Sequence, residues 1–456
     1  MLLSLIDYHM SVTALSPLDG RYHSKVEELS NYFSEAALIK YRLILETNYL
    51  RSLAQILPEL AGDREKIEDA LSIIISTLNE SNIARVKDIE RETNHDVKAI
   101  EYHLKELLVS YDLSQYQEFV HFGLTSQDIN NTVLSLQLKD SICDIMRPNI
   151  ESITSTLDSI STDWDNIVML SRTHGQPASP TTLRKELFVF VNRITTQKKM
   201  METIPFTSKF SGAVGNFNAH MAAYPEIDWC NFSDTFLEGL GIARNRLTTQ
   251  IEPYDNTCAL FDNIRRINSI LIDMVRDIWM YISLDYFKLK IVKGEVGSST
   301  MPHKVNPIDF ENAEGNLMLS NAMLSFMSEK LPISRLQRDL TDSTVLRNVG
   351  VMFGYSLLAY KNIIVGLNKL RPNVSKIDDD LEDNWVIVSE GIQTILKRYG
   401  YQKPYELIKE LTRTGSKVGK DHLHLWIDSL QITDNDLVVK LKSLTPQNYL
   451  GNLNLS

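Results

Sequence analysis

Residues 294–307, "GEVGSSTMPHKVNP", bring together side chains that could transfer a proton or bind an anion. Ser298 and Ser299 supply adjacent hydroxyls, and Lys304 supplies a cation. Asn306 can cap a helix that begins at the next proline, and the partial positive charge of a helix N-terminus favours an anion. The segment therefore predicts an anion-binding loop, although a surface loop of ordinary turn residues would have the same composition.

A second polar loop, "SRTHGQPASP", covers residues 171–180. His174 stands between a threonine and a glycine, where it can reach a cleft, and its ordinary pKa of about 6.5 suits proton transfer. The pattern also predicts that Ser179 caps a helix that begins at Pro180. A purely structural histidine fits these residues as well, so both interpretations stay open.

A hydroxyl and amide cluster, "HFGLTSQDINNT", occupies residues 121–132 at the start of an expected helix. Residues 125–128 have the spacing of a capping box, in which the first side chain and the fourth satisfy backbone N–H groups reciprocally. Capping alone could explain Thr125 and Ser126. Ligand binding is the alternative for the same two hydroxyls.

A fourth cluster lies in "ERETNHDVKAIEYH", residues 90–103. Asn94, His95 and Asp96 place hydrogen-bond donors, an acceptor and a titratable group side by side. His95 and His103 lack the four-residue spacing that pairs two metal ligands on one helix face. The sequence therefore predicts no metal site and no other cofactor.

Nucleotide-binding loops are missing, because the chain has neither a Walker loop nor a GxGxxG turn after a strand. The phosphate of a bound nucleotide would have to be held by scattered side chains, and arginine forks and hydroxyls suit it. The candidates in "SPLDGRY" and "RLQRDLTDSTVLRN" are Arg21, Tyr22, Arg335, Arg338, Ser343, Thr344 and Arg347. Surface salt bridges remain the simpler explanation for any single arginine.

Long segments with helical periodicity separate these loops and must position them. Residues 35–57 and 344–370 repeat apolar residues at three- and four-residue intervals. Residues 254–293 contain neither glycine nor proline and predict one helix about 60 Å long. A further helix is expected from Ser126 to an interruption near Pro148.

The predicted fold class is all-α, because convincing strand alternation is scarce. We expect an N-terminal helical domain (residues 1–120), a central long-helix bundle (121–370) and a C-terminal helical domain (371–456). Proline and an acidic run in "RPNVSKIDDDLEDN" predict the junction before the last domain. Helices as long as the central ones require a bundle, which we expect subunits to share.

Composition narrows the function further. The chain has 456 residues and a formal net charge of −11, which argues against nucleic-acid or acidic-membrane binding but allows a small anionic substrate in a local cationic pocket. Its 3 cysteines are widely scattered, which favours a reducing, cytoplasmic setting. Residues 1–9, before Met10, are predicted to be a dispensable extension.

The motifs resemble one known group of enzymes. "GSSTMPHKVNP" is similar to the signature loop of the fumarase/aspartase superfamily, and "SRTHGQPASP" and "HFGLTSQDINN" resemble its two other shared segments in the correct order. "SPLDGRY", "TNHDVKAIEY", "TTQIEPYD" and "RDLTDSTVLRN" resemble the adenylosuccinate lyase family of the bacterial type. The resemblance runs from about Thr13 to "TPQNYLG", nearly the whole chain.

This resemblance implies a homotetramer whose active sites each combine loops of three subunits. It implies β-elimination of fumarate from adenylosuccinate to give AMP, and from SAICAR to give AICAR, in purine synthesis and without a cofactor. Ser298 would be the base and His174 the acid. The implied substrate-binding residues are Arg21, Tyr22, Asn94, His95, Asp96, Thr125, Ser126, Gln250, Ser299, Lys304, Asn306, Arg338, Ser343, Thr344 and Arg347.

Two alternatives differ from this assignment. The first is an enzyme with another substrate, and the second is a protein of another functional class. Argininosuccinate lyase, aspartase and fumarase would share the signature loop but need no nucleotide phosphate, so "DGRY" and "DSTVLRN" favour adenylosuccinate. A structural protein that has lost activity would not need Ser298, His174 and Lys304 together. Incubation with each candidate succinyl-amine and detection of fumarate would discriminate among these alternatives.

Overall fold

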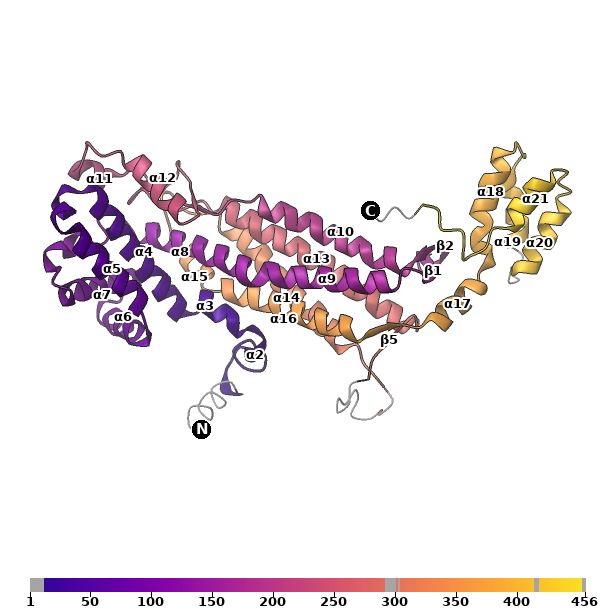
Figure 1. Ribbon diagram of the computed structural model, residues 1–456, viewed down its shortest axis with the longest axis horizontal. Helices are drawn as coiled ribbons and strands as arrows, with labels where there is room; N and C mark the ends of the chain where they lie inside the picture. Colours follow the sequence, from indigo (N-terminus) through magenta and orange to yellow (C-terminus); the bar gives the residue numbers. More distant parts are fainter. Residues whose placement is uncertain (1–11, 292–300, 302–303, 414–417, 453–456) are drawn as a thin grey trace. The chain divides into compact units, whose positions relative to one another are not determined.

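The computed structural model describes residues 12–291, 301, 304–413 and 418–452. Helices dominate, as Figure 1 shows, and the strands of the described part form three two-stranded sheets. The predicted all-α fold class is confirmed. The chain divides into two compact units: the first comprises Met1–Ile150, Gln197–Ser269 and Gly315–Lys361, and the second comprises Glu151–Thr196, Ile270–Glu314 and Asn362–Ser456. The division into three domains, with boundaries after residues 120 and 370, stays a prediction.

The first unit begins with short helices that lead into a compact helical cluster. Ser34 caps the first long helix, since its hydroxyl accepts a hydrogen bond from the N–H of Ala37 at 3.1 Å. The helices of this unit include α3 (Ser30–Phe33), α4 (Glu35–Ile56), α5 (Arg64–Thr77), α6 (Glu80–Thr93), α7 (Asp96–Ser110), α8 (Ser126–Ser141), α11 (Asn218–Ala223), α12 (Trp229–Gly239) and α15 (Thr341–Leu346).

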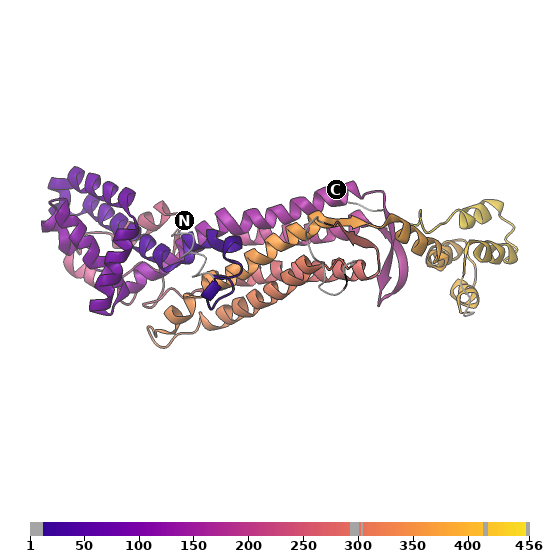
Figure 2. The ribbon, with the colours of Figure 1, turned by 90° about the horizontal axis from the view of Figure 1, so that it is seen from below.

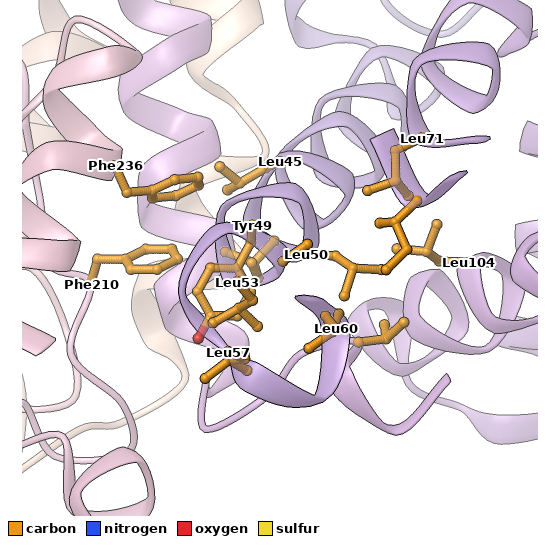
Figure 3. Close-up of a cluster of buried hydrophobic side chains, with 14 of the residues drawn as sticks. Leu45, Tyr49, Leu50, Leu53, Leu57, Leu60, Leu71, Leu104, Phe210 and Phe236 are labelled. Atoms are coloured by element: carbon orange, nitrogen blue, oxygen red, sulfur yellow. The ribbon is translucent and has the colours of Figure 1, made fainter. Parts of the chain in front are cut away.

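The core of this cluster is built on α4. Figure 3 shows Leu45, Tyr49 and Leu53 of α4 pointing toward Phe210 and Phe236, which come from much later in the chain. Tyr49 is fully buried, and its hydroxyl donates to the carbonyl of Phe122 at 2.7 Å. Burial of such side chains stabilises each by roughly 1.5–3 kcal/mol. The core therefore fixes α4 against the segment that precedes α8.

Long helices contribute to both units: α9 (Arg147–Asp163), α10 (Leu183–Glu202), α13 (Asp255–Ser283), α14 (Ile308–Lys330) and α16 (Val349–Lys369). In the first unit, Asn268 of α13 donates to Ser356 of α16 at 2.9 Å and accepts from Tyr360 at 2.6 Å. In the second unit, Figures 1 and 2 show α9 and the adjoining parts of the other long helices running together as a bundle, and Tyr281 of α13 donates to Glu186 of α10 at 2.5 Å. The predicted long-helix bundle is confirmed.

One bundle segment also has the composition of a membrane span. Thr341–Lys369 reaches a mean hydropathy of 1.3, but 67% of that apolar window is buried inside the protein. Core helices of soluble proteins have the same length and composition, because their apolar residues face neighbouring helices instead of lipid. We therefore interpret α15 and α16 as core elements.

The sequence-based bounds of two long helices need correction. The predicted helix over residues 254–293 ends at Ser283, so it is about 44 Å long. Asp285 takes a φ of 62°, and the N–H of Tyr286 bonds to the carbonyl of Tyr281 at 2.9 Å, which closes the helix in the way a glycine usually does. The expected break near Pro148 is a π-helical segment, Ile142–Met146, before α9 resumes.

Two predicted local structures are wrong. Residues 176–182 form strand β2 (Gln176–Thr182), paired with β1 (Val168–Thr173), so Ser179 does not cap a helix at Pro180. The prediction of a loop did not take β1 into account, whose buried residues Met169 and Leu170 pair with β2. Helix α10 begins at Leu183 instead, where the hydroxyl of Thr182 accepts from the N–H of Lys185 at 3.2 Å.

The predicted junction after residue 370 is likewise structured. It contains strand β6 (Leu370–Pro372), which pairs with β5 (Phe287–Leu289), and helix α17 (Val374–Glu382). The second unit then continues with α18 (Ser389–Arg398), α19 (Pro404–Thr412), α20 (Lys420–Ser429) and α21 (Asn435–Lys442). Their apolar faces share a core with Leu170 and Trp385.

A buried ion pair links the start of α8 to the segment after α10. Lys209 and Asp128 are both 0% exposed, and the Lys209 Nζ lies 2.7 Å from the Asp128 carboxylate. The same carboxylate accepts from the N–H of Thr125 and the N–H of Ser211, each at 2.8 Å. Removal of one member of such a pair leaves an uncompensated buried charge.

We expect Lys209→Met to lower the free energy of unfolding by about 3–5 kcal/mol, since Asp128 would keep its hydrogen bonds but lose its cation. Chemical denaturation at one fixed protein concentration measures this. Lys40→Met, at an exposed position of α4, is the matched control and should change stability by less than about 0.5 kcal/mol. Equal stability of the two variants would contradict the role of the pair.

Candidate active site

A pocket of about 650 Å³ opens in the first unit, at the ends of α6, α7, α8 and α15. It brings together residues from sequence motifs that lie far apart in the chain. The sequence-predicted residues that line it are Asn94, His95, Asp96, Ser126, Arg338, Ser343, Thr344 and Arg347. Convergence of these motifs on one cavity makes it the candidate substrate site.

The turn between α6 and α7 presents Asn94 and His95 to the pocket. Asn94 takes a φ of 51° and ends α6, with its N–H bonded to the carbonyl of Glu90 at 2.8 Å. His95 caps α7, because its Nδ1 accepts from the N–H of Lys98 at 3.1 Å. The neutral imidazole therefore carries its proton on Nε2, and the side chain is 52% exposed.

Asp96 is held ionised at the first turn of α7. Its carboxylate accepts from Arg42 at 2.9 Å, from the N–H of Val97 at 2.9 Å and from Arg347 at 3.4 Å. Burial opposes ionisation, but the charge of Arg42 and its hydrogen bond outweigh burial and lower the pKa of Asp96. Arg42 is only 4% exposed and also donates to Asn130 at 3.0 Å.

Arg338 and Arg347 have different partners in the pocket. Arg347 pairs with Glu35 at 3.0 Å in addition to Asp96. Arg338 instead donates to the hydroxyl of Ser343 at 3.3 Å and to the Gln250 side chain at 3.5 Å, and both of these groups are neutral. An arginine whose hydrogen-bond partners are neutral keeps its charge available for an anionic ligand.

Thr125 and Ser126 start α8 as the sequence predicts. The capping box is confirmed: the N–H of Thr125 donates to the Asp128 side chain at 2.8 Å. Ser126 lines the pocket, whereas Thr125 and Gln250 belong to the same unit without lining it. Capping thus engages the backbone N–H of Thr125, and Ser126 is the member of this pair that lines the pocket.

Arg21 and Tyr22 are also in the first unit but do not line this pocket. The guanidinium of Arg21 lies over the ring of Tyr22, 5.8 Å from the ring centroid. Arg335 forms an exposed pair with Asp339 at 3.1 Å. The pocket geometry therefore does not support a phosphate-binding role for Arg21, Tyr22 or Arg335.

His174, the predicted acid, belongs to the second unit. His174 occupies the turn of the β1–β2 hairpin with a φ of 53° and is exposed. Lys304 and Asn306 precede α14 in the second unit, where the N–H of Lys304 bonds to the carbonyl of Met301 at 3.0 Å. Ser298 and Ser299 lie outside the described residues. Helix α14 begins at Ile308, one residue later than the cap at Asn306 implies.

Several lining residues escaped the sequence analysis: Glu35, Arg42, Gln127, Asn130 and Tyr254. Arg42 and Glu46 are one helical turn apart on the buried face of α4. The sequence signal that could have revealed Arg42 is a charged residue at an apolar position of an amphipathic helix, because burial of a charge requires a partner. No group of three or more potential metal ligands occurs within the described ranges.

His121, four residues before Thr125, is partly buried between two carboxylates, with its side chain 11% exposed. Its Nδ1 lies 2.5 Å from Glu46, and its Nε2 lies 3.9 Å from Glu101. Burial favours the neutral imidazole, but the charge and hydrogen bond of Glu46, with Glu101, prevail and raise the pKa of His121 above 6.5. The hydrogen bond between His121 and Glu46 thus ties the segment before α8 to α4.

A raised folded-state pKa means that His121 contributes stability that is fully present below its unfolded pKa of about 6.5. This contribution is lost as the pH rises through the raised pKa. We therefore expect the stability difference between the wild type and His121→Asn to shrink as the pH rises from about 6.5 through the raised pKa. Unfolding free energies across that range test this, with His422→Asn as an exposed control; a constant difference would contradict it.

Comparison with known proteins agrees with these motifs and this fold. A family model described as "Lyase" matches residues 20–324, and one described as "Adenylosuccinate lyase C-terminal" matches residues 334–450. The chain is 52% identical over 454 residues to adenylosuccinate lyase of Dictyostelium discoideum. It is 48% identical over 447 residues to that of Escherichia coli, and each comparison covers 97% of both chains.

Solved structures support the fold alone, because their sequence identity is low. Fumarate lyase from Mesorhizobium sp. aligns with a TM-score of 0.75 at 18% identity, over 93% of this chain and 95% of that one. A 3-carboxy-cis,cis-muconate lactonizing enzyme from Pseudomonas putida aligns with a TM-score of 0.71 at 17% identity, over 93% and 94%.

The helical fold and the converging motifs define an enzyme of the lyase class, in the fumarase/aspartase superfamily. The high sequence identity along nearly the whole chain and the matching C-terminal family model identify one family within this superfamily. The chain belongs to the adenylosuccinate lyase family.

Proposed function

We propose that this carbon–nitrogen lyase eliminates fumarate from adenylosuccinate to give AMP, and from SAICAR to give AICAR, by general acid–base catalysis. Elimination of a succinyl-amine in purine synthesis is the activity of the family to which it belongs. The observation that carries the assignment of the site is the pocket that gathers Arg338, Ser343 and Arg347 with Asn94 and Asp96. An arginine and hydroxyl cluster fits a nucleotide phosphate and is unnecessary for a nucleotide-free substrate.

The substrate would lie with its phosphate against Arg338, Ser343 and Arg347. Arg338 suits this role because its hydrogen-bond partners are neutral. We assign Arg21, Tyr22 and Thr344 to the same phosphate by resemblance, and Gln250 to substrate orientation. Asn94, His95 and Asp96 would lie near the base and the departing nitrogen.

The succinyl carboxylates need cationic and hydroxyl partners from elsewhere. We assign them to Thr125, Ser126, Ser299, Lys304 and Asn306, by resemblance to the family. The place of Ser126 in the lining of the pocket supports its part in this set. Negative charge builds on one carboxylate when the neighbouring carbon loses its proton, so these contacts would strengthen as the reaction proceeds.

Ser298 would remove the carbon-bound proton, and His174 would protonate the departing nitrogen. A serine hydroxyl is a poor base in water, so the alkoxide requires stabilisation. We assign this stabilisation to the positive charge of Lys304, the glycine-loop amides and the helix that follows. The exposed position of His174 on a hairpin turn supports a role toward a ligand instead of a structural one.

We further propose a homotetramer in the cytoplasm, with each active site built from three subunits. We assign the completion of each site by other chains from the resemblance to the family. The three cysteines are free thiols, which supports a reducing compartment.

Ser298→Ala and His174→Ala should each lower kcat by about 10²–10⁴-fold while the purified protein still folds, because positioned proton transfer contributes that much to the rate. Fumarate release from adenylosuccinate measures kcat, and circular dichroism measures folding. His422→Ala, at an exposed histidine of α20, should retain full activity. Near-normal turnover in either active-site variant would remove its assigned role.

Mixing the two inactive variants tests the shared site. If Ser298 and His174 of one site come from different subunits, re-associated mixed tetramers should regain roughly a quarter of wild-type activity at equal proportions. Size-exclusion chromatography with light scattering should give a mass four times the 52.1 kDa chain. A monomer, or mixtures that stay inactive after subunit exchange, would contradict this arrangement.

A further inference from the structure

Asp342 is a buried carboxylate beside the pocket, and none of the roles above uses it. It is 4% exposed and lies at the second position of α15, directly before Ser343. No ion pair of Asp342 occurs among the described residues. A buried charge without an ionic partner requires several hydrogen-bond donors, because desolvation otherwise makes it costly.

Those donors come from three chain segments. The Asp342 carboxylate accepts from the amide of Gln127 at 2.7 Å, from the hydroxyl of Tyr254 at 3.0 Å and from the backbone N–H of Ser343 at 2.7 Å. Gln127 and Tyr254 are each 1% exposed, so water does not compete for these bonds. Burial, followed by the charge of Asp342, raises the pKa of Tyr254 well above its usual value, so the phenol stays a donor.

Each segment also carries a predicted substrate ligand. Gln127 follows Ser126 at the start of α8, and Tyr254 stands four residues after Gln250. One carboxylate therefore fixes the mutual positions of three chain segments that are remote in the sequence. Hydrogen bonds from rigid, buried donors hold such segments more precisely than loop packing does.

The connection to the proposed phosphate site runs through Ser343. Its hydroxyl donates to the Asp342 carboxylate at 3.4 Å and accepts from Arg338 at 3.3 Å. Because the hydroxyl proton is directed toward Asp342, its lone pairs face the guanidinium. The carboxylate thus orients Ser343 and, through it, Arg338, whose buried Nε has no hydrogen-bond partner among the described residues.

We infer that Asp342 is a positioning residue for nucleotide binding, which acts through Ser343 and Arg338 without touching the substrate. This inference rests on the proposed phosphate site. It predicts a selective effect: loss of the Asp342 charge should weaken binding of the nucleotide part of the substrate more than binding of the succinyl part. A merely structural carboxylate would lower stability without that selectivity.

Asp342→Asn preserves the size of the side chain, and Gln127 can turn its unpartnered Oε1 toward the new amide. Isothermal titration of the full-length enzyme should then give a Kd for AMP raised about tenfold or more, and a Kd for fumarate changed less than about threefold. KM for adenylosuccinate should rise more than kcat falls. Asp69→Asn, at an exposed position of α5, is the matched control and should leave every constant unchanged.

A double-mutant cycle separates positioning from general damage. Asp342→Asn and Arg338→Gln should be strongly non-additive in AMP affinity, since both act at one contact. Additive losses, or equal loss of AMP and fumarate binding, would overturn the inference. Should Asp342→Asn fail to fold, Tyr254→Phe removes only one donor and should raise the Kd for AMP about threefold; an unchanged Kd would also overturn it.

The single Arg338→Gln variant keeps the two claims apart. If it weakens AMP binding while Asp342→Asn does not, the phosphate site stands and the positioning role of Asp342 fails. If Arg338→Gln leaves AMP affinity unchanged, the phosphate assignment fails, and the role of Asp342 falls with it.

Discussion

Carboxylates at the starts of helices, each paired with a buried cation, are the constraint on which the site depends. Asp96 at the start of α7 is bound by Arg42, and Asp128 near the start of α8 is bound by Lys209. An unpaired charge at the depth of Arg42 or Lys209 costs several kcal/mol, so each of these cations binds its carboxylate firmly. The helix ends, and with them the side chains that face the pocket, therefore have little freedom to separate.

The two arginines that line the pocket differ in how far their charges are neutralised. Arg347 is compensated by Glu35 and Asp96, whereas Arg338 meets neutral oxygens of Ser343 and Gln250. An incoming phosphate would gain most from the arginine that has no carboxylate to leave. The overall charge of −11 is thus compatible with an anionic substrate, because local partners and not the net charge decide the potential at the site.

Sequence alone was sufficient for the fold class, the long bundle helices, the capping box at Thr125 and the family. These depend on periodicity and local hydrogen bonds, which neighbouring residues determine. It missed the end of α13, because Asp285 adopts a conformation that usually signals glycine, and it missed the strand at Ser179, whose partner is Met169 and Leu170. Arg42 and Asp342 also escaped it, since their partners lie far away in the chain.

The central claim is that the pocket of the first unit holds the nucleotide. A crystal structure of the inactive Ser298→Ala enzyme with adenylosuccinate tests it most directly. The account predicts the phosphate within hydrogen-bond distance of Arg338 and Ser343, with His174 of some subunit beside the departing nitrogen. A phosphate bound away from both Arg338 and Ser343 would contradict it.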